Sequence, residues 1–194
     1  MGCNISRPQG AHPADTLLEI APVMTAGHNN LPPDLDRDTL LRALTNVAHY
    51  LNSQRANITV ISVGGANEWF NNRTVLFIPK ANREYLTQRA FAQNETVFDR
   101  PGLKVLAAPW DYAMCAKLDR CAGAGPTSAK PYDYSDAATY LHRYLEIYNL
   151  TSVTRSQVYA WAASYMTTVT DAVLERLNSE FYSKYDRSDI DMRT

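Results

Sequence analysis

The sequence predicts a mixed α/β protein, an α+β arrangement in which a small mixed sheet is flanked by helices and followed by a helical C-terminal part. Two kinds of segment predict this fold class. Short runs of β-branched residues end at Gly or Pro, as strands do, and the segments beside them repeat apolar residues at helical spacing. The chain has 194 residues, of which 45% are hydrophobic and 20% are charged, and this composition is enough to bury one core.

The N-terminal half is expected to begin with one helix and two strands. Residues 34–54 carry Leu40 and Leu44 on one helical face, and several acidic residues stand at the start, where they favour a helix N-terminus. The run ITVISV at 58–63 predicts a buried strand that ends in a tight turn at the two glycines after it. The run TVLFI at 74–78 predicts a second strand.

Three helices and one strand are expected in the middle of the chain. We predict a helix at 82–93, a strand at 103–108 and a helix at 109–120, because proline suits the first turn of a helix. A loop rich in Gly, Ala and Pro follows. The next helix is expected to begin with Asp133 as its N-cap and Asp136 at the third position, where both would cap backbone N–H groups.

The C-terminal segment is expected to hold one long helix. Thr154 and Gln157 form a capping box, and apolar residues continue at helical spacing to about Phe181. After Lys184 the chain becomes polar, and we expect it to fray. The expected organisation is therefore a flexible tether, a core, a C-terminal helix packed on that core and a frayed tail, at residues 1–33, 34–148, 149–184 and 185–194.

Charge and composition exclude several functional classes. The net charge is -1, and Lys and Arg are scattered, so there is no strong signal for nucleic-acid binding. No window approaches the roughly 18 apolar residues of a spanning helix, and the N-terminus has no apolar region of the kind that directs secretion, so we expect a cytoplasmic protein. The three cysteines and four histidines show no disulfide framework, zinc motif or catalytic triad.

The first residues fit a lipidation motif. Gly2 and Ser6 match the pattern M-G-x-x-x-[ST], and Cys3 stands beside the glycine that would be myristoylated. A single myristoyl chain holds a protein weakly, whereas a second acyl group on Cys3 would make the anchoring durable. The sequence therefore predicts acylation at Gly2 and Cys3, with the cytoplasmic face of a membrane as one expected partner.

Two stretches of the sequence carry a resemblance to a known family. The first is ITVISVGGA at 58–66, and the second is LKVLAAPWDYAMCAKLDR at 103–120, followed by KPYDYSDAATYL at 130–141. They resemble the minimal nucleotidyltransferases of the DNA polymerase beta-like superfamily, especially toxin-type members and their uncharacterised fungal relatives. The resemblance covers roughly residues 36–148 and implies a nucleotide as partner. It implies that Gly64 and Gly65 form the turn that holds a nucleoside triphosphate. The residues that match the later motif are Lys117, Arg120, Lys130, Asp133 and Asp136.

The chain departs from this family at the metal-binding segment. In the family, the strand after the glycine turn presents D-x-D, whose spacing aims two carboxylates at one divalent metal. Here Ala66 is followed by Asn-Glu-Trp-Phe, and no D-x-D lies between Ala66 and the second expected strand. The pairs Asp34–Asp36 and Asp36–Asp38 are explained by helix capping, and Asp189–Asp191 lies in the expected tail. We therefore expect no catalytic residue, no metal site and no cofactor.

The sequence leaves several functions open. The leading interpretation is a nucleotidyltransferase-like domain without metal-dependent catalysis, which acts by binding a nucleotide or an unidentified protein. The alternatives are an active, magnesium-dependent nucleotidyltransferase with carboxylates from elsewhere, a lipid-anchored adaptor, and a shortened product of a longer protein. Simpler explanations also exist for the motif, because Lys117 suits the solvated face of an amphipathic helix and Asp133 and Asp136 suit helix capping.

Overall fold

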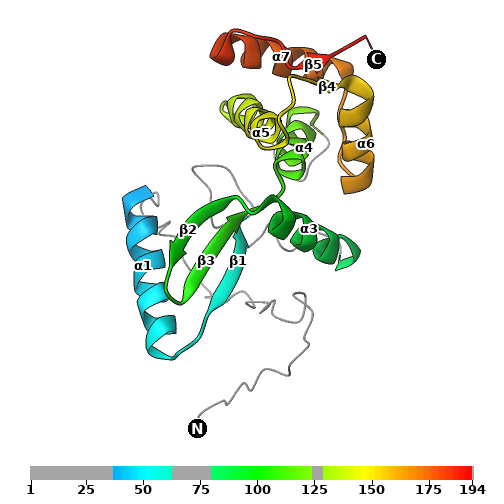
Figure 1. Ribbon diagram of the computed structural model, residues 1–194. Helices are drawn as coiled ribbons and strands as arrows, with labels where there is room; N and C mark the ends of the chain where they lie inside the picture. The colour runs from blue at the N-terminus through cyan, green and yellow to red at the C-terminus, as the bar shows by residue number, and fades with distance from the viewer. Residues whose placement is uncertain (1–36, 63–79, 124–128, 194) are drawn as a thin grey trace, which may run out of the picture. The chain divides into compact units, whose positions relative to one another are not determined.

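The computed structural model describes residues 37–62, 80–123 and 129–193, and the described residues divide into two compact units. Residues 37–62 and 80–107 form the first unit, and residues 108–123 and 129–193 form the second. The described chain contains six helices and a small mixed sheet, which confirms the α+β class (Figure 1). The boundary between Ala107 and Ala108 is not apparent from the sequence.

The first unit contains two helices and a three-stranded sheet. Its elements are α1 (Arg37–Ser53), β1 (Ile58–Ser62), α3 (Lys80–Gln93), β2 (Thr96–Arg100) and β3 (Leu103–Ala107). The helices expected at 34–54 and 82–93 and the strands expected at 58–63 and 103–108 are confirmed within the described residues. The strand expected at 74–78 lies outside the described residues.

The sheet has the strand order β1-β3-β2, with β3 in the centre (Figure 1). β1 runs parallel to β3, and β2 runs antiparallel to β3 with an irregularity in register between Thr96 and Phe98. β3 is almost entirely buried, whereas every residue of β1 is half-buried. α1 contacts β3 and β2 and buries Leu40, Leu44 and Ala48, so its apolar stripe covers the sheet.

β2 is a strand that the sequence analysis missed. Its hairpin turn with β3 is formed by Pro101 and Gly102, and Gly102 has a φ of +97°, which disfavours other residues. A Cβ atom on Gly102 would lie 2.6 Å from the carbonyl oxygen of Ala48 and 2.7 Å from the backbone nitrogen of Asn52. The hairpin therefore packs directly on the backbone of α1, and a side chain at this position would push the two apart.

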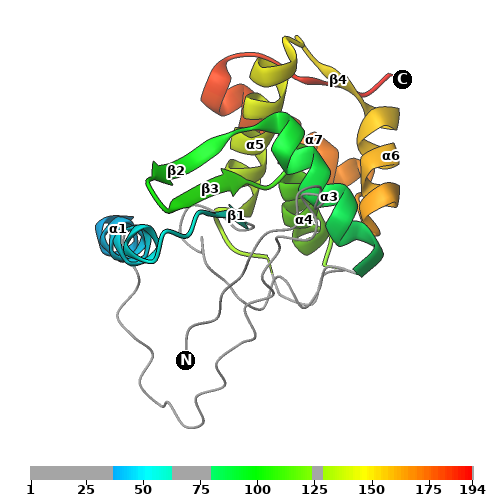
Figure 2. The same cartoon turned by 60° about the horizontal axis from the view of Figure 1, so that its bottom comes forward.

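The second unit consists mainly of four helices. They are α4 (Trp110–Cys121), α5 (Asp133–Tyr148), α6 (Arg155–Tyr165) and α7 (Asp171–Tyr185), and two short strands, β4 (Val153–Thr154) and β5 (Ile190–Asp191), pair in parallel. α5 contacts both α4 and α7, and α4 also contacts α6 (Figures 1 and 2). Their shared core contains Met114, Leu118, Leu141, Leu145, Val158, Leu174, Leu177 and Phe181.

The C-terminal part differs from the sequence-based expectation. The long helix expected from Thr154 to Phe181 is wrong, because Met166 has a left-handed conformation and ends α6. Thr170 then starts α7, and its side chain accepts a hydrogen bond from the backbone nitrogen of Val173. The β-branched residues between the two helices disfavour a continuous helix.

The segment expected to fray after Lys184 also differs in the structure. Asp189 and Ile190 are buried, and Ile190 pairs with Val153 in the short parallel sheet. This end of the chain is therefore held by pairing and burial, which a polar local sequence does not reveal. None of the helices in the described part of the chain is long and apolar enough to cross a membrane.

Candidate functional site

The candidate site lies in the second unit, where α4 and α5 pack against each other. Lys117 and Arg120 are three residues apart on α4, and Asp133 and Asp136 are three residues apart at the start of α5. Residues three apart in a helix share one face. The packing of these two faces brings two cations and two carboxylates together, and we name this group the ion network.

Distances within the ion network show that the four charges are fully engaged with one another. Lys117 Nζ lies 3.0 Å from Asp133 Oδ1 and 2.6 Å from Asp136 Oδ2. Arg120 donates from Nε to Asp133 Oδ2 at 3.1 Å and from Nη2 to Asp133 Oδ1 at 2.6 Å. The two positive and two negative charges leave the network neutral as a whole.

Asp133 is the centre of the ion network. Its side chain is fully buried, and it accepts a further hydrogen bond from the backbone nitrogen of Lys130 at 2.8 Å. Burial alone would raise the pKa of Asp133, but the hydrogen bonds from Arg120, Lys130 and Lys117 outweigh it and lower that pKa below its ordinary value. The carboxylate therefore stays ionised and holds the loop end at Lys130 against α5.

The structure corrects the simpler explanations of the motif. Lys117 does not lie on a solvated face, because its side chain is only 5% exposed and its ammonium lies 5.1 Å from the ring centre of Tyr132. Asp133 is not the N-cap of α5, since Tyr132 occupies that position and offers no side-chain cap. Asp133 uses its carboxylate to bind α4 instead.

Of the expected nucleotide-binding residues, the structure brings together those on the helix-loop-helix segment. Lys117 and Arg120 belong to the ion network, and Lys130 joins it through its backbone nitrogen while its side chain is exposed. Gly64 and Gly65 lie outside the described residues. The lipidation sites expected at Gly2 and Cys3 also lie outside them.

Two further residues, Cys121 and Tyr134, lie beside the ion network, and the sequence did not predict them as part of the site. Burial, followed by the charge of Asp133, raises the pKa of the Cys121 thiol, so the thiol is held in its unreactive neutral form. Burial is also the main cause that raises the pKa of Tyr134, which interacts with Cys121. The sequence shows that Cys121 follows Arg120 directly and lies four residues after Lys117, but it does not show the environment of the thiol.

Metal binding does not fit the acidic residues of the ion network. Asp133 and Asp136 already bind Lys117 at short distance, so a divalent cation would have to displace a buried ammonium. Among the residues that the structure describes, no cluster of three or more His, Cys, Asp or Glu side chains could hold a metal ion. We therefore derive no reaction step that passes through a metal.

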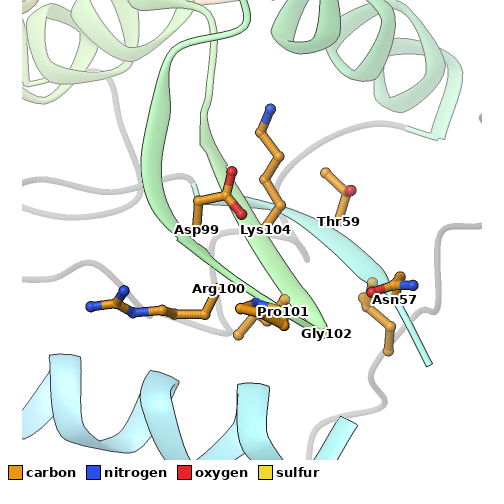
Figure 3. A pocket seen from close by; sticks show the side chains of 9 residues that line it. Asn57, Thr59, Asp99, Arg100, Pro101, Gly102 and Lys104 are labelled. Carbon is orange, nitrogen blue, oxygen red and sulfur yellow. The ribbon is translucent and has the colours of Figure 1, made fainter. Parts of the chain in front are cut away.

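A pocket of about 370 Å³ lies in the first unit, at the β2–β3 hairpin (Figure 3). Asp99, Lys104 and Thr59 point to the same side of the strands, whereas Arg100 points away (Figure 3). Lys104 already donates to Asn94 Oδ1 at 3.1 Å. None of the expected site residues lines the pocket, so we do not assign a function to it.

The fold and the ion network define an α+β protein whose second unit is cross-linked through buried charges. Residues 64–188 match the family model described as a domain of unknown function, DUF7582. The match covers well over half of the chain, and the chain therefore belongs to this family. Searches of curated proteins and of solved structures found no match.

Proposed function

We propose that this protein is a nucleotidyltransferase-like domain that binds a nucleotide or a protein partner and does not perform metal-dependent nucleotide transfer. The observation that carries the proposal is the ion network. It fixes Lys117 and Arg120 on α4 in one arrangement, next to the backbone of Lys130. These are the cations that the resemblance assigns to nucleotide binding.

The exposed side of the ion network is where a phosphate group would bind. Arg120 has a side chain that is 23% exposed, and the side chain of Lys130 is exposed beside it. Lys130 would bind a phosphate as a point charge. Arg120 already uses Nε and Nη2 on Asp133, so it would orient the phosphate from beside it. Lys117 is buried between its two carboxylates, so we assign it the role of positioning the other groups.

The neutral charge of the ion network is the reason for a binding function without catalysis. Phosphoryl transfer needs positive charge that is available to the developing transition state, usually from a metal ion. In this protein the carboxylates of Asp133 and Asp136 neutralise the buried ammonium of Lys117. A phosphate at Arg120 would be oriented, but it would gain little of the charge stabilisation that accelerates transfer.

Equilibrium binding of a fluorescent ATP analogue to the full chain, with and without magnesium, tests the proposal. We expect saturable binding that persists in EDTA. Lys130→Ala should weaken it about tenfold or more, since a charge-assisted hydrogen bond contributes about 1.5 to 3 kcal/mol. Lys184→Ala is the matched control, because Lys184 is an exposed lysine of the same unit that binds Ser135 and Thr139 outside the network.

Two results would contradict the proposal. Absence of saturable binding for all four ribonucleoside triphosphates would contradict nucleotide binding and leave only a protein partner. Incorporation of radioactive label from a nucleotide into the protein, RNA or a small acceptor, if abolished by EDTA, would instead show an active enzyme. If label is incorporated, Lys130→Ala shows whether the incorporation depends on this site.

A further inference from the structure

The last described residues of the chain form a short, defined attachment to the second unit. β5 pairs in parallel with β4, and the backbone nitrogen of Val153 donates to the carbonyl oxygen of Asp189 at 2.8 Å. The side chain of Asn178, on α7, donates to the carbonyl oxygen of Ile190 and accepts from its backbone nitrogen, both at 3.1 Å. We name residues 189–191, held in this way, the C-terminal latch.

The latch contains a buried carboxyl group that its surroundings do not satisfy. Asp189 is fully buried, and neither of its carboxyl oxygens has a hydrogen-bond partner among the described residues. The backbone nitrogen of the next residue, Ile190, donates to Asn178 instead. An ionised carboxylate in such a place is costly, because it loses its hydration and gains no donor in return.

The charges around Asp189 are too few to compensate for this burial. β4 contributes no titratable side chain, and α7 contacts the latch through the neutral amide of Asn178. Asp191, the neighbouring acid, is held by Arg193 at 3.0 Å. Burial raises the pKa of Asp189 to about 7, although its own backbone N–H group, Arg187 and the Ile190 N–H group oppose the rise.

We propose that Asp189 makes the C-terminal latch proton-dependent: the latch is closed while the Asp189 carboxyl is neutral, and it is weakened when this carboxyl ionises. In the open state the carboxyl group is surrounded by water, and the apolar side chains of Ile190 and Val153, which are 4% and 1% exposed in the closed latch, become accessible.

The pH range in which the latch should respond follows from the pKa of Asp189 in the open and in the closed latch. In the open latch Asp189 has its ordinary pKa of 3.8, and in the closed latch its pKa is about 7. Below pH 3.8 both states are protonated, and the latch has its full stability. Between pH 3.8 and about 7, Asp189 is ionised in the open latch but still protonated in the closed latch. The equilibrium constant for closing the latch therefore falls by up to about tenfold per pH unit. Above the higher value the equilibrium no longer changes.

Amide hydrogen exchange on the full chain, followed by NMR, tests the proposal. The amides of Val153 and Ile190 make latch hydrogen bonds, so their protection factors report latch closure. After correction for intrinsic exchange, we expect both factors to fall more than about tenfold from pH 5 to pH 7.5. The amide of Leu177, in the buried core of α7, should change far less.

Two variants separate the role of Asp189 from other effects. Asp189→Asn replaces the carboxyl group by a neutral amide of similar shape, and its latch protection should not depend on pH. Asp186→Asn is the matched control, because Asp186 is an exposed acid between α7 and the latch. It should show the same fall in protection as the unmodified protein. An equal fall in Asp189→Asn would overturn the proposal.

A direct titration keeps the test independent of any variant. The side-chain carboxyl carbon of Asp189, followed by NMR in the unmodified protein, should titrate with a midpoint clearly above 5, whereas an ordinary aspartate titrates near 3.9. A midpoint near 4, with constant protection of Val153 and Ile190 between pH 5 and pH 7.5, would show that the latch does not respond to protons.

Discussion

Asp133 and Asp189 are both fully buried in the same unit, yet their pKa values move in opposite directions. Asp133 accepts hydrogen bonds from two cationic side chains and one backbone nitrogen, and its pKa is lowered. Asp189 accepts none from the described residues, and its pKa is raised. Burial therefore does not decide whether a carboxyl group is charged; the donors that meet it decide.

The largest expected effect comes from removing a cation of the ion network. Lys117→Met keeps the length of the side chain but leaves the buried carboxylate of Asp133 and the half-buried carboxylate of Asp136 with one cation, and breaking a buried pair costs about 3 to 5 kcal/mol. We expect urea unfolding at pH 7 to show a loss of this size. Lys130→Met, at an exposed side chain, should stay within about 0.5 kcal/mol of the unmodified protein. Equal stability of the two variants would contradict the comparison.

The second expected effect is a stability maximum in mildly acidic solution. The lowered pKa of Asp133 contributes stability above pH 3.8, which is lost as pH falls through its folded-state pKa. The raised pKa of Asp189, about 7, costs stability as pH rises from 3.8 towards that value. The free energy of unfolding should therefore peak near pH 3.8, where the two ranges meet, and the Asp189 effect above this pH should be at most about 4 kcal/mol.

The free energy of unfolding of Asp189→Asn, measured at the same pH values, separates the decline above the maximum from the decline below it. The variant should lose the decline between pH 4 and pH 7 and keep the decline in stronger acid, because Asp133 is unchanged. Urea unfolding at intervals from pH 3 to pH 8 provides both curves. A variant curve that is parallel to that of the unmodified protein would show that Asp189 does not contribute.

Asp111 provides a third buried carboxyl group and a smaller expected effect. The hydroxyl group of Tyr165, on α6, donates to Asp111 Oδ2 at 2.9 Å and so joins α6 to α4. Tyr165→Phe removes this donor without changing the ring, and we expect a loss of about 1 to 3 kcal/mol. Thermal unfolding measures it, with Tyr182→Phe, at an exposed tyrosine of α7, as the control.

The smallest effect is expected at the ion pair of Arg155 and Asp171, whose hydrogen bonds are short but whose side chains are exposed to water. Arg155 makes two hydrogen bonds to Asp171, at 2.6 Å and 2.7 Å, yet both side chains are largely in water. Exposed ion pairs contribute little, because water and salt screen them. We expect Arg155→Gln to leave the unfolding midpoint unchanged within error. A clear loss in this variant would weaken the argument that burial gives the ion network its strength.

The sequence predicted best those elements that depend on local patterns. α1, α3, α4 and α5 are formed by segments whose apolar residues repeat at helical spacing, and this signal is complete within each segment. β2 was missed because it is short and gains its stability from pairing with β3. The end of α6 was missed because Met166, unlike glycine, gives no local warning of a left-handed conformation.

The candidate site was predicted in its residues but not in its arrangement. Lys117, Arg120, Asp133 and Asp136 were recognised from one sequence pattern, and the structure places them together. The binding of Lys117 to both carboxylates was not predicted, because it depends on how α4 packs on α5. The burial of Asp189 was missed for the same reason, since a polar segment acquires its environment from partners distant in the chain.

The parallel pairing of β4 with β5 has a consequence for the order of folding. The register that joins Val153 to Ile190 closes a loop that contains the whole of α6 and α7. Closing such a loop costs entropy that the few contacts of two-residue strands repay only after both helices are already in place. During synthesis, residues 189–191 leave the ribosome after both helices. We therefore expect this part of the fold to form after α6 and α7, with Val153 accessible to water until then.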